Sequence, residues 1–277
     1  MIQIGKTCRL QVVKQVNFGV YLNAEQYGQV LLPNKVTPKD CQVGDWLDVF
    51  LYLDSEDQLI ATTARPKAQV GEFALLKVVS ISRVGAFLDW GLDKDLLLPF
   101  AEQKRPPEEG RSVLVYIHIN HADDRIVASA KLDKFLDKTP AFYKPGQKVD
   151  LIIAGTSDLG YKAIVNQAHW GVLYNNEVFK KLRFGQQVQG YVKQVRHDGK
   201  LDLQLQRGNR EELDSHAKLI MDKLRKAGGF LPLTDKTDAD VIYAELGMSK
   251  KAFKKSIGGL FKAGQLSIDN DGLRIAE

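Results

Sequence analysis

The amino-acid sequence predicts a mostly β chain, in which three tandem five-stranded barrels precede a C-terminal α+β part. Three observations predict this fold class. Residues 1–66 align with residues 67–132 without a gap. Each of these stretches holds about five short runs rich in β-branched and aromatic residues. Beyond residue 208 the apolar residues instead recur at intervals of three and four, which is typical of amphipathic helices.

The internal repeat has a period of 66 residues. The aligned pairs include Gly5 and Gly71, Gly19 and Gly85, Tyr21 and Phe87, Pro33 and Pro99, and Ile60 and Ile126. One register held across a whole unit indicates a duplicated domain. We therefore expect one domain over residues 1–66 and a second over residues 67–132.

Each unit has the strand content of a small barrel. In the first unit the strands are expected at Thr7–Val16, Gly19–Asn23, Gln29–Pro33, Trp46–Asp54 and Gln58–Thr63. About five strands in a unit of this length match a Greek-key OB barrel, whereas a sandwich needs about seven. The repeats are also too long for a typical solenoid.

A third, more divergent unit is expected over residues 145–208. Its strands are expected at Leu151–Ala154, Tyr161–Asn166, His169–Tyr174, Gly190–Val195 and Leu201–Leu205. Asp198-Gly199 between the last two suits a tight hairpin. Between the second and third units, Lys131–Lys144 resembles a short linking helix that ends at Pro145.

Residues 209–277 have the element order of a winged helix. A first helix carries its apolar face on Leu213, Ala217, Ile220, Leu224 and Ala227, and a second is expected over Asp238–Leu246. Ser249 is placed to cap a third helix that runs to Ala263, in which Gly258-Gly259 indicates close packing. Leu266–Ile268 and Leu273–Ile275 form a closing hairpin.

Composition and charge narrow the class of protein. The chain has a formal net charge of +5, and a count by segment gives −1 for residues 1–66 and +5 for residues 133–208. A modest basic bias is compatible with phosphate contacts. No secretory leader or membrane-spanning run is recognised, and Cys8 and Cys41 lie in strand-like runs typical of reduced core thiols. These features favour a cytoplasmic location.

Two segments resemble a known RNA-binding module. Val16–Leu22 and Arg83–Leu88 place a glycine and a small residue before an aromatic side chain, and in the first segment Phe18 supplies a preceding aromatic. This pattern resembles the S1 RNA-binding domain, an OB-fold module. In the second segment Val84 replaces the first aromatic residue, and the third unit lacks the aromatic pair.

The complete order of three such units and a winged helix is similar to the CvfB (conserved virulence factor B) family, which includes the YitL proteins. His169–Tyr174 and His197–Leu203 in the third unit are especially specific to it. The resemblance implies RNA binding and a post-transcriptional role in gene regulation. It implies no catalytic activity.

Aromatic and basic residues of the first two units are the first binding candidates. Phe18, Tyr21 and Phe87 are candidates for stacking on unpaired bases, and Lys14 and Arg83 beside them for phosphate contacts. A spacing of three puts Phe18 and Tyr21 on opposite faces of a strand unless a bulge at Gly19 intervenes. The alternative is that these rings belong to the core.

Two further basic groups are candidates. In the third unit they are Lys180, Lys181, Arg183, Lys193 and Arg196, with Tyr191 interleaved. In the last helix they are Lys250, Lys251, Lys254 and Lys255, on rows opposite its apolar stripe. Either group is equally compatible with a solvated surface. Trp170 and Tyr174 are expected in the core.

No enzyme motif is recognised in the sequence. His118 and His121 have metal-like spacing, but no nearby Cys, Asp or Glu completes a ligand set. No phosphate-binding loop, dinucleotide fingerprint or nucleophile elbow occurs. We therefore expect a non-enzymatic protein that needs no metal or cofactor and binds single-stranded RNA, with duplex nucleic acid as a possible partner of the winged helix. The alternatives are a protein-interaction scaffold and a winged-helix DNA-binding regulator.

Overall fold

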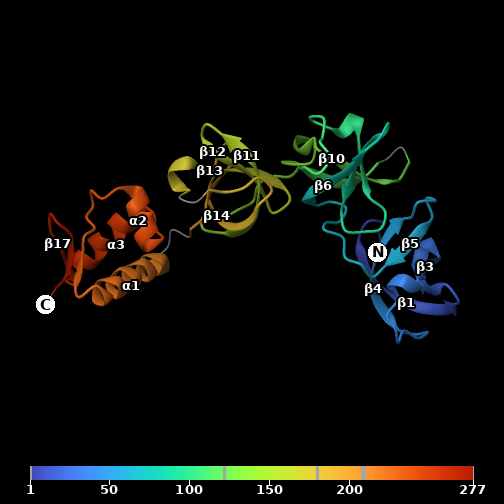
Figure 1. The fold of residues 1–277 in the computed structure, drawn as a ribbon, viewed down its shortest axis with the longest axis horizontal. Helices are drawn as coiled ribbons and strands as arrows, with labels where there is room; N and C mark the ends of the chain where they lie inside the picture. The colour runs from blue at the N-terminus through green and yellow to red at the C-terminus, as the bar shows by residue number, and fades with distance from the viewer. Residues whose placement is uncertain (1, 121–122, 179–180, 207–209, 277) are drawn as a thin grey trace. The chain divides into compact units, whose positions relative to one another are not determined.

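The computed structural model describes residues 2–120, 123–178, 181–206 and 210–276, with the backbone alone for 210–215. Over these residues the chain contains three closed five-stranded barrels and a C-terminal part with three α-helices (Figure 1). It divides into two compact units, Met1–Leu136 and Asp137–Glu277. The predicted fold class is confirmed.

Barrel 1 contains the strands expected from the first repeat. They are β1 (Thr7–Val16), β2 (Gly19–Asn23), β3 (Gln29–Pro33), β4 (Trp46–Leu53) and β5 (Leu59–Thr62), closed in the order β1-β2-β3-β5-β4. Alternate residues such as Val20, Leu22 and Leu32 point inward and are at most 2% exposed. The register of β1 against β2 shifts between Val12 and Lys14, so β1 carries a bulge there.

Barrel 2 repeats this architecture. Its strands are β6 (Phe73–Ile81), β7 (Gly85–Asp89), β8 (Leu96–Pro99), β9 (Ser112–Ile119) and β10 (Ile126–Ser129). The register shift recurs between Val78 and Ser80, each 66 residues after its counterpart in barrel 1. The duplication therefore extends to an irregularity of the backbone.

Barrel 3 has the same order of strands and the same bulge. Its strands are β11 (Lys148–Ser157), β12 (Gly160–Val165), β13 (His169–Tyr174), β14 (Gln187–Val195) and β15 (Leu201–Gln204). A glycine opens the second strand of every barrel because the backbone of the third strand lies against it. A Cβ atom would lie 2.3 Å from the Leu32 carbonyl oxygen at Gly19, 2.3 Å from that of Leu98 at Gly85, and 2.0 Å from that of Leu173 at Gly160.

Short 3-10 helices connect several strands. They are η1 (Glu25–Tyr27), η2 (Asn34–Val36), η3 (Phe100–Glu102), η4 (Leu132–Lys134) and η5 (Asn175–Glu177). The predicted linking helix over Lys131–Lys144 is wrong, because only the η4 turn forms there. Asp137 adopts a positive φ of 55°, its amide donates to the carbonyl of Ala168 at 2.9 Å, and Pro140 supplies no amide donor.

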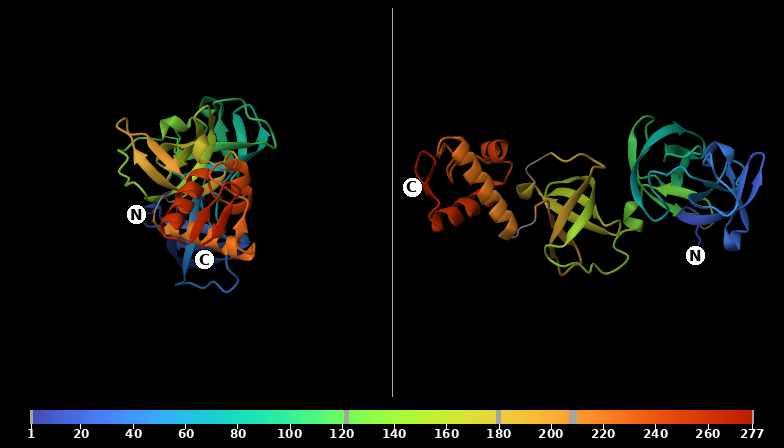
Figure 2. Two further views of the ribbon diagram at one scale, coloured as in Figure 1. Left: turned by 90° about the vertical axis from the view of Figure 1, so that its left-hand side faces the viewer. Right: turned by 90° about the horizontal axis from the view of Figure 1, so that it is seen from below.

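The C-terminal part is a winged helix. Its elements are α1 (Arg210–Lys226), β16 (Phe230–Leu231), α2 (Ala239–Leu246), α3 (Lys250–Lys262), β17 (Leu266–Ile268) and β18 (Leu273–Ile275). The helices lie against one another in the orange-to-red part of Figure 2. The Ser249 hydroxyl accepts the Ala252 amide at 3.1 Å, which confirms the predicted cap. Strand β16 was not predicted from the sequence, and it extends the predicted hairpin to a sheet of order β16-β18-β17. The expectation of close packing at Gly258 and Gly259 is wrong, because a Cβ atom at either position would meet no atom within 4 Å among the described residues.

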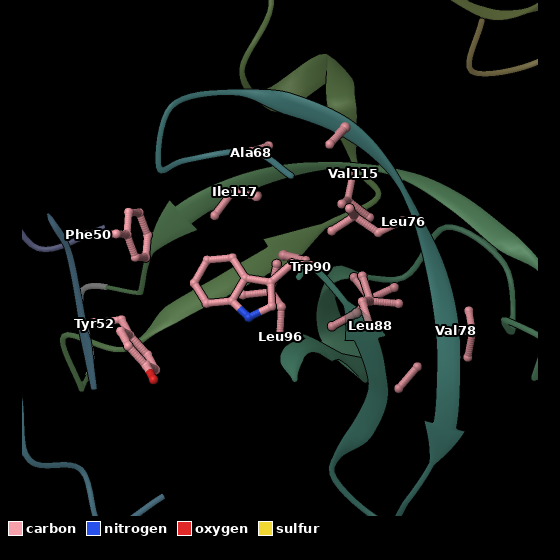
Figure 3. Close-up of a cluster of buried hydrophobic side chains, with 14 residues drawn as sticks. Phe50, Tyr52, Ala68, Leu76, Val78, Leu88, Trp90, Leu96, Val115 and Ile117 are labelled. Atoms are coloured by element: carbon pink, nitrogen blue, oxygen red, sulfur yellow. The ribbon is translucent and has the colours of Figure 1, made fainter. Parts of the chain in front are cut away.

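The hydrophobic core of barrel 2 includes two side chains from barrel 1. Phe50 and Tyr52 of β4 point toward Trp90, and the Phe50 and Trp90 rings meet edge to face with centroids 5.6 Å apart (Figure 3). Phe50 is 1% exposed and Trp90 is 3% exposed. Buried aromatic contacts of this kind account for the first two barrels forming one compact unit.

Candidate nucleic-acid interface

The aromatic pair of barrel 1 lies at the hairpin between β1 and β2. Val16 pairs with Gly19, so Asn17 and Phe18 form a two-residue turn, and the Phe18 side chain is 57% exposed. Tyr21 points outward from β2 because Val20 and Leu22 point into the barrel. The two rings meet edge to face at 6.5 Å.

The expected bulge at Gly19 is not what brings the two rings together. Phe18 belongs to the turn, so strand alternation does not fix its direction. The bulge lies instead in β1, between Val12 and Lys14, and it sets Lys14 opposite Tyr21. On its other side Tyr21 faces Leu31 of β3. An exposed cation, an aromatic ring and an apolar side chain therefore lie side by side on the outer face.

The turn that carries Phe18 is held by a residue that the sequence analysis missed. The amide of Asn34, the first residue of η2, donates to the Phe18 carbonyl at 3.0 Å, and its side chain donates to the Asn17 carbonyl at 2.7 Å. Asn175 makes the matching contacts in barrel 3, to Leu159 and Asp158. Asn34 follows the third strand of barrel 1 and Asn175 follows the third strand of barrel 3. This recurrence in the sequence could have identified the residue that holds the turn.

In barrel 2 the corresponding face is turned toward barrel 1. Phe87 lies opposite Ser80 and Leu97, and it lines a cavity of about 200 Å³ together with Tyr52 and Asp57 of barrel 1. Val84, 58% exposed, stands where barrel 1 has Phe18. Arg83 is exposed in the same turn. The residues predicted for stacking therefore lie in different surroundings in the two barrels.

An acidic hairpin of barrel 1 supplies the wall of that cavity. Asp57, in the turn between β4 and β5, forms ion pairs with Arg125 and with Lys94, the latter at 3.4 Å. Desolvation opposes ionisation of this carboxyl group, but the Arg125 guanidinium and Lys94 hold its pKa below the ordinary value. The two cations next to Phe87 are thus already paired.

Barrel 3 replaces the aromatic of β2 with a cation. Lys162 occupies the position of Tyr21 in the β11–β12 register, and its ammonium group lies 3.7 Å from the ring centroid of Trp170. The prediction that Trp170 and Tyr174 are core residues is wrong, since both are half-buried on the outside of the barrel. The Tyr174 hydroxyl donates to Asp202 at 3.1 Å, and this bond raises the pKa of Tyr174.

The basic residues predicted in the third unit do not form one free cluster. Lys181 and Arg183 are exposed in the connection between β13 and β14, and Tyr191 is half-buried on β14. Lys193 is bound to Glu177 at 2.6 Å, which raises its pKa, and Arg196 lies 3.3 Å from Asp198. Lys180 lies outside the described residues.

The lysines of α3 divide into two kinds. Lys250 donates to the Lys236 carbonyl at 3.2 Å, and Lys254 lies 3.6 Å from the Asp235 carboxylate. Lys251 and Lys255 are exposed and form no ion pair with the residues that the structure describes. Of the two predicted rows, Lys250 and Lys254 are engaged by other residues of the winged helix. Lys251 and Lys255 are the row with unpaired cations among the described residues.

The described ranges contain neither a cluster of metal-binding side chains nor a helix that could span a membrane. Within them, no group of three or more His, Cys, Asp or Glu side chains lies close enough to hold a metal ion. The His118 Nδ1 atom lies 3.1 Å from the Ile119 carbonyl, while His121 falls outside the described residues. No described helix has the length and apolar character needed to cross a membrane.

Two family models match the chain, one at each end. Residues 4–64 match the S1 domain, and residues 218–275 match the CvfB-like winged helix domain. The predicted resemblance to the CvfB family is confirmed. The S1 match supports nucleic-acid binding, and the matched families are not known enzyme families.

Relatives resemble the chain over most of its length. The uncharacterized protein YitL of Bacillus subtilis is 27% identical, over 96% of this chain and 91% of its own. Conserved virulence factor B of Staphylococcus saprophyticus is 25% identical, over 86% of this chain and 82% of its own. A multidomain protein with nucleic acid binding domains from Streptococcus pneumoniae aligns over 98% of both chains, with 24% identity and a TM-score of 0.42.

Proposed function

We propose that this CvfB-like chain binds single-stranded RNA and acts in the cytoplasm as a post-transcriptional regulator. The observation that carries the proposal is the outer face of barrel 1, where the exposed Phe18 ring meets Tyr21 next to Lys14. The match of this barrel to the S1 domain supports the same assignment.

The chemistry expected of this face is base stacking beside a phosphate contact. Each unpaired base that stacks on an aromatic side chain contributes about 1–3 kcal/mol, with little dependence on its identity. The Phe18 turn is held by two hydrogen bonds from Asn34, so its ring is presented without a large ordering cost. Lys14, opposite Tyr21, is placed to neutralise a phosphate of the same strand.

Single strands fit this face better than a duplex does. Stacking on Phe18 and Tyr21 needs bases whose faces are free, and in a duplex these faces are covered by neighbouring pairs. The two rings lie at 81° to each other, so a bound strand has to turn between two stacked bases. Such a turn requires the backbone freedom of a single strand.

The test is a binding measurement on the purified full chain. A fluorescent single-stranded RNA of mixed sequence is titrated by anisotropy over a salt series, with unlabelled single-stranded DNA and duplex DNA as competitors. We expect a micromolar or smaller Kd that rises with salt and resists duplex DNA. Stronger competition by duplex DNA would favour a DNA-binding regulator, and no binding at low salt would overturn the proposal.

A further inference from the structure

Three exposed apolar residues surround the turn between β6 and β7 of barrel 2. Val84 lies in this turn and is 58% exposed, Phe100 begins η3 and is 54% exposed, and Ile81 ends β6 and is 44% exposed. Gly85 pairs with Pro99 in the antiparallel β7–β8 ladder, so Val84 and Phe100 occupy neighbouring positions just beyond that pair. Ile81, Val84 and Phe100 together are called the barrel 2 tip.

Two of these positions are polar in barrel 1. Ile81 aligns with Gln15 and Phe100 aligns with Asn34, each 66 residues earlier in the chain. Barrel 3 also begins the corresponding 3-10 helix with an asparagine, Asn175. The barrel fold therefore does not require an apolar side chain at these exposed positions.

Phe100 lacks a hydrogen bond that asparagine makes in the other two barrels. The side chains of Asn34 and Asn175 each donate to a carbonyl oxygen of the adjoining turn, at 2.7 and 3.2 Å. A phenyl ring has no hydrogen-bond donor, and Phe100 gains little burial in exchange because more than half of it stays exposed. Neither the turn nor the core accounts for phenylalanine here, so the structure points to a contact with another molecule.

Unpaired cations border the barrel 2 tip. The connection from η3 to β9 returns beside the turn, because the Glu109 carboxylate accepts the Ile81 amide at 3.0 Å. Lys104 and Arg105 in this connection and Arg83 in the turn are exposed. None of these three forms an ion pair with the residues that the structure describes. Three cations beside one carboxylate favour an acidic partner.

We propose that the barrel 2 tip docks a segment of another protein in which carboxylates flank apolar side chains. The complex would bury the three apolar residues of the tip, and Arg83, Lys104 and Arg105 would face the carboxylates. A protein fits better than RNA, because Ile81 and Val84 are aliphatic and offer no ring on which a base could stack. The inference does not depend on the proposed RNA binding by barrel 1.

The first test selects binding peptides without assuming their sequence. A phage library of random peptides of about 12 residues is panned on the immobilised full chain, and the selected peptides are titrated by fluorescence anisotropy. We expect peptides in which leucine, isoleucine, phenylalanine or tryptophan alternate with aspartate and glutamate, and a Kd that rises with salt. Selection of basic peptides, or of none, would overturn the proposal.

Substitutions that give barrel 2 the residues of barrel 1 locate the site. Phe100→Asn and Ile81→Gln should each weaken binding of a selected acidic peptide about tenfold. Phe142→Ser is the matched control, because Phe142 is an 87% exposed phenylalanine outside barrel 2, and it should change the Kd less than about twofold. The melting temperature of Phe100→Asn should not fall, since asparagine supplies the donor that holds the turn in barrel 1.

The same variants separate the other occupants of the tip. If Phe100→Asn weakens RNA binding as much as Phe18→Ala does, the tip is an RNA contact and a protein partner is overturned. If the wild-type chain dimerises in sedimentation velocity and Phe100→Asn abolishes the dimer, a second copy occupies the tip. Unchanged peptide binding by both tip variants would overturn the site and leave the function proposed for barrel 1 standing.

Discussion

Barrels 1 and 2 have the same strand order, the same bulge and the same obligatory glycine, yet their outer faces differ. Barrel 1 presents Phe18 and Tyr21 beside an exposed Lys14, whereas Phe87 of barrel 2 lines a cavity together with Tyr52 and Asp57 of barrel 1. The comparison teaches that duplicating a domain duplicates its fold but not the residues that surround a given surface position.

The largest expected effect comes from separating the two barrels. Phe50→Ala removes a fully buried ring from the shared core and should lower the free energy of unfolding by about 3–5 kcal/mol. Chemical denaturation followed by tryptophan fluorescence measures the loss. Trp46→Ala is the control on the same strand, because Trp46 is 56% exposed, and it should cost far less. Equal losses for both variants would contradict a core shared between the barrels.

The next effect concerns the two aromatic faces. Phe18→Ala combined with Tyr21→Ala should weaken RNA binding by about 1–3 kcal/mol for each stacked base that is lost, while Phe87→Ala should change it by less than about 0.5 kcal/mol. Phe100 is an aromatic residue of barrel 2 that is 54% exposed, so Phe100→Ala is the control for nonspecific binding of RNA to exposed aromatic side chains. Anisotropy titrations measure the binding of each variant, and thermal melts measure its stability. If the double variant no longer melts cooperatively, the two rings stabilise the fold.

A smaller effect should follow from removing Asp57, the acidic side chain of barrel 1 that pairs with two cations of barrel 2. Asp57→Ala releases Arg125 and Lys94 beside Phe87, so RNA affinity should rise about threefold at low salt. Glu56→Ala changes the charge equally in the same hairpin but is absent from the ion pairs described for Asp57. A gain of the same size for Glu56→Ala would mean that net charge alone is responsible.

The smallest effect is a pH dependence of the same ion pairs. The pKa of Asp57 is lowered from 3.8 in the folded chain, so its contribution to stability is fully present above that value. It should be lost as the pH falls through the lower, folded-state pKa. Thermal melts of the wild type and Asp57→Asn should therefore differ at pH 7 and converge as the pH falls below 3.8. A difference that persists unchanged at low pH would exclude ionisation of Asp57 as its origin.

Local sequence patterns were enough to predict most elements of the fold. The bounds of β1, β2 and β3 agree with the expectation, and the Ser249 cap and closing hairpin were also found. The linking helix failed because Asp137 makes a long-range hydrogen bond that favours a non-helical backbone. The strand β16 was missed because two residues carry too little periodicity, and their pairing with β18 is a tertiary contact.

The sequence by itself determined the three five-stranded barrels and the winged-helix order that follows them, because period, turn residues and the repeat can be recognised along the chain. It also identified Phe18, Tyr21, Phe87 and the lysines of α3 as candidates by residue type. Only the tertiary structure decided that Asp57 and Phe87 line one cavity and that Lys254 is paired. These properties depend on exposure and on partners remote in sequence, and no local pattern encodes them.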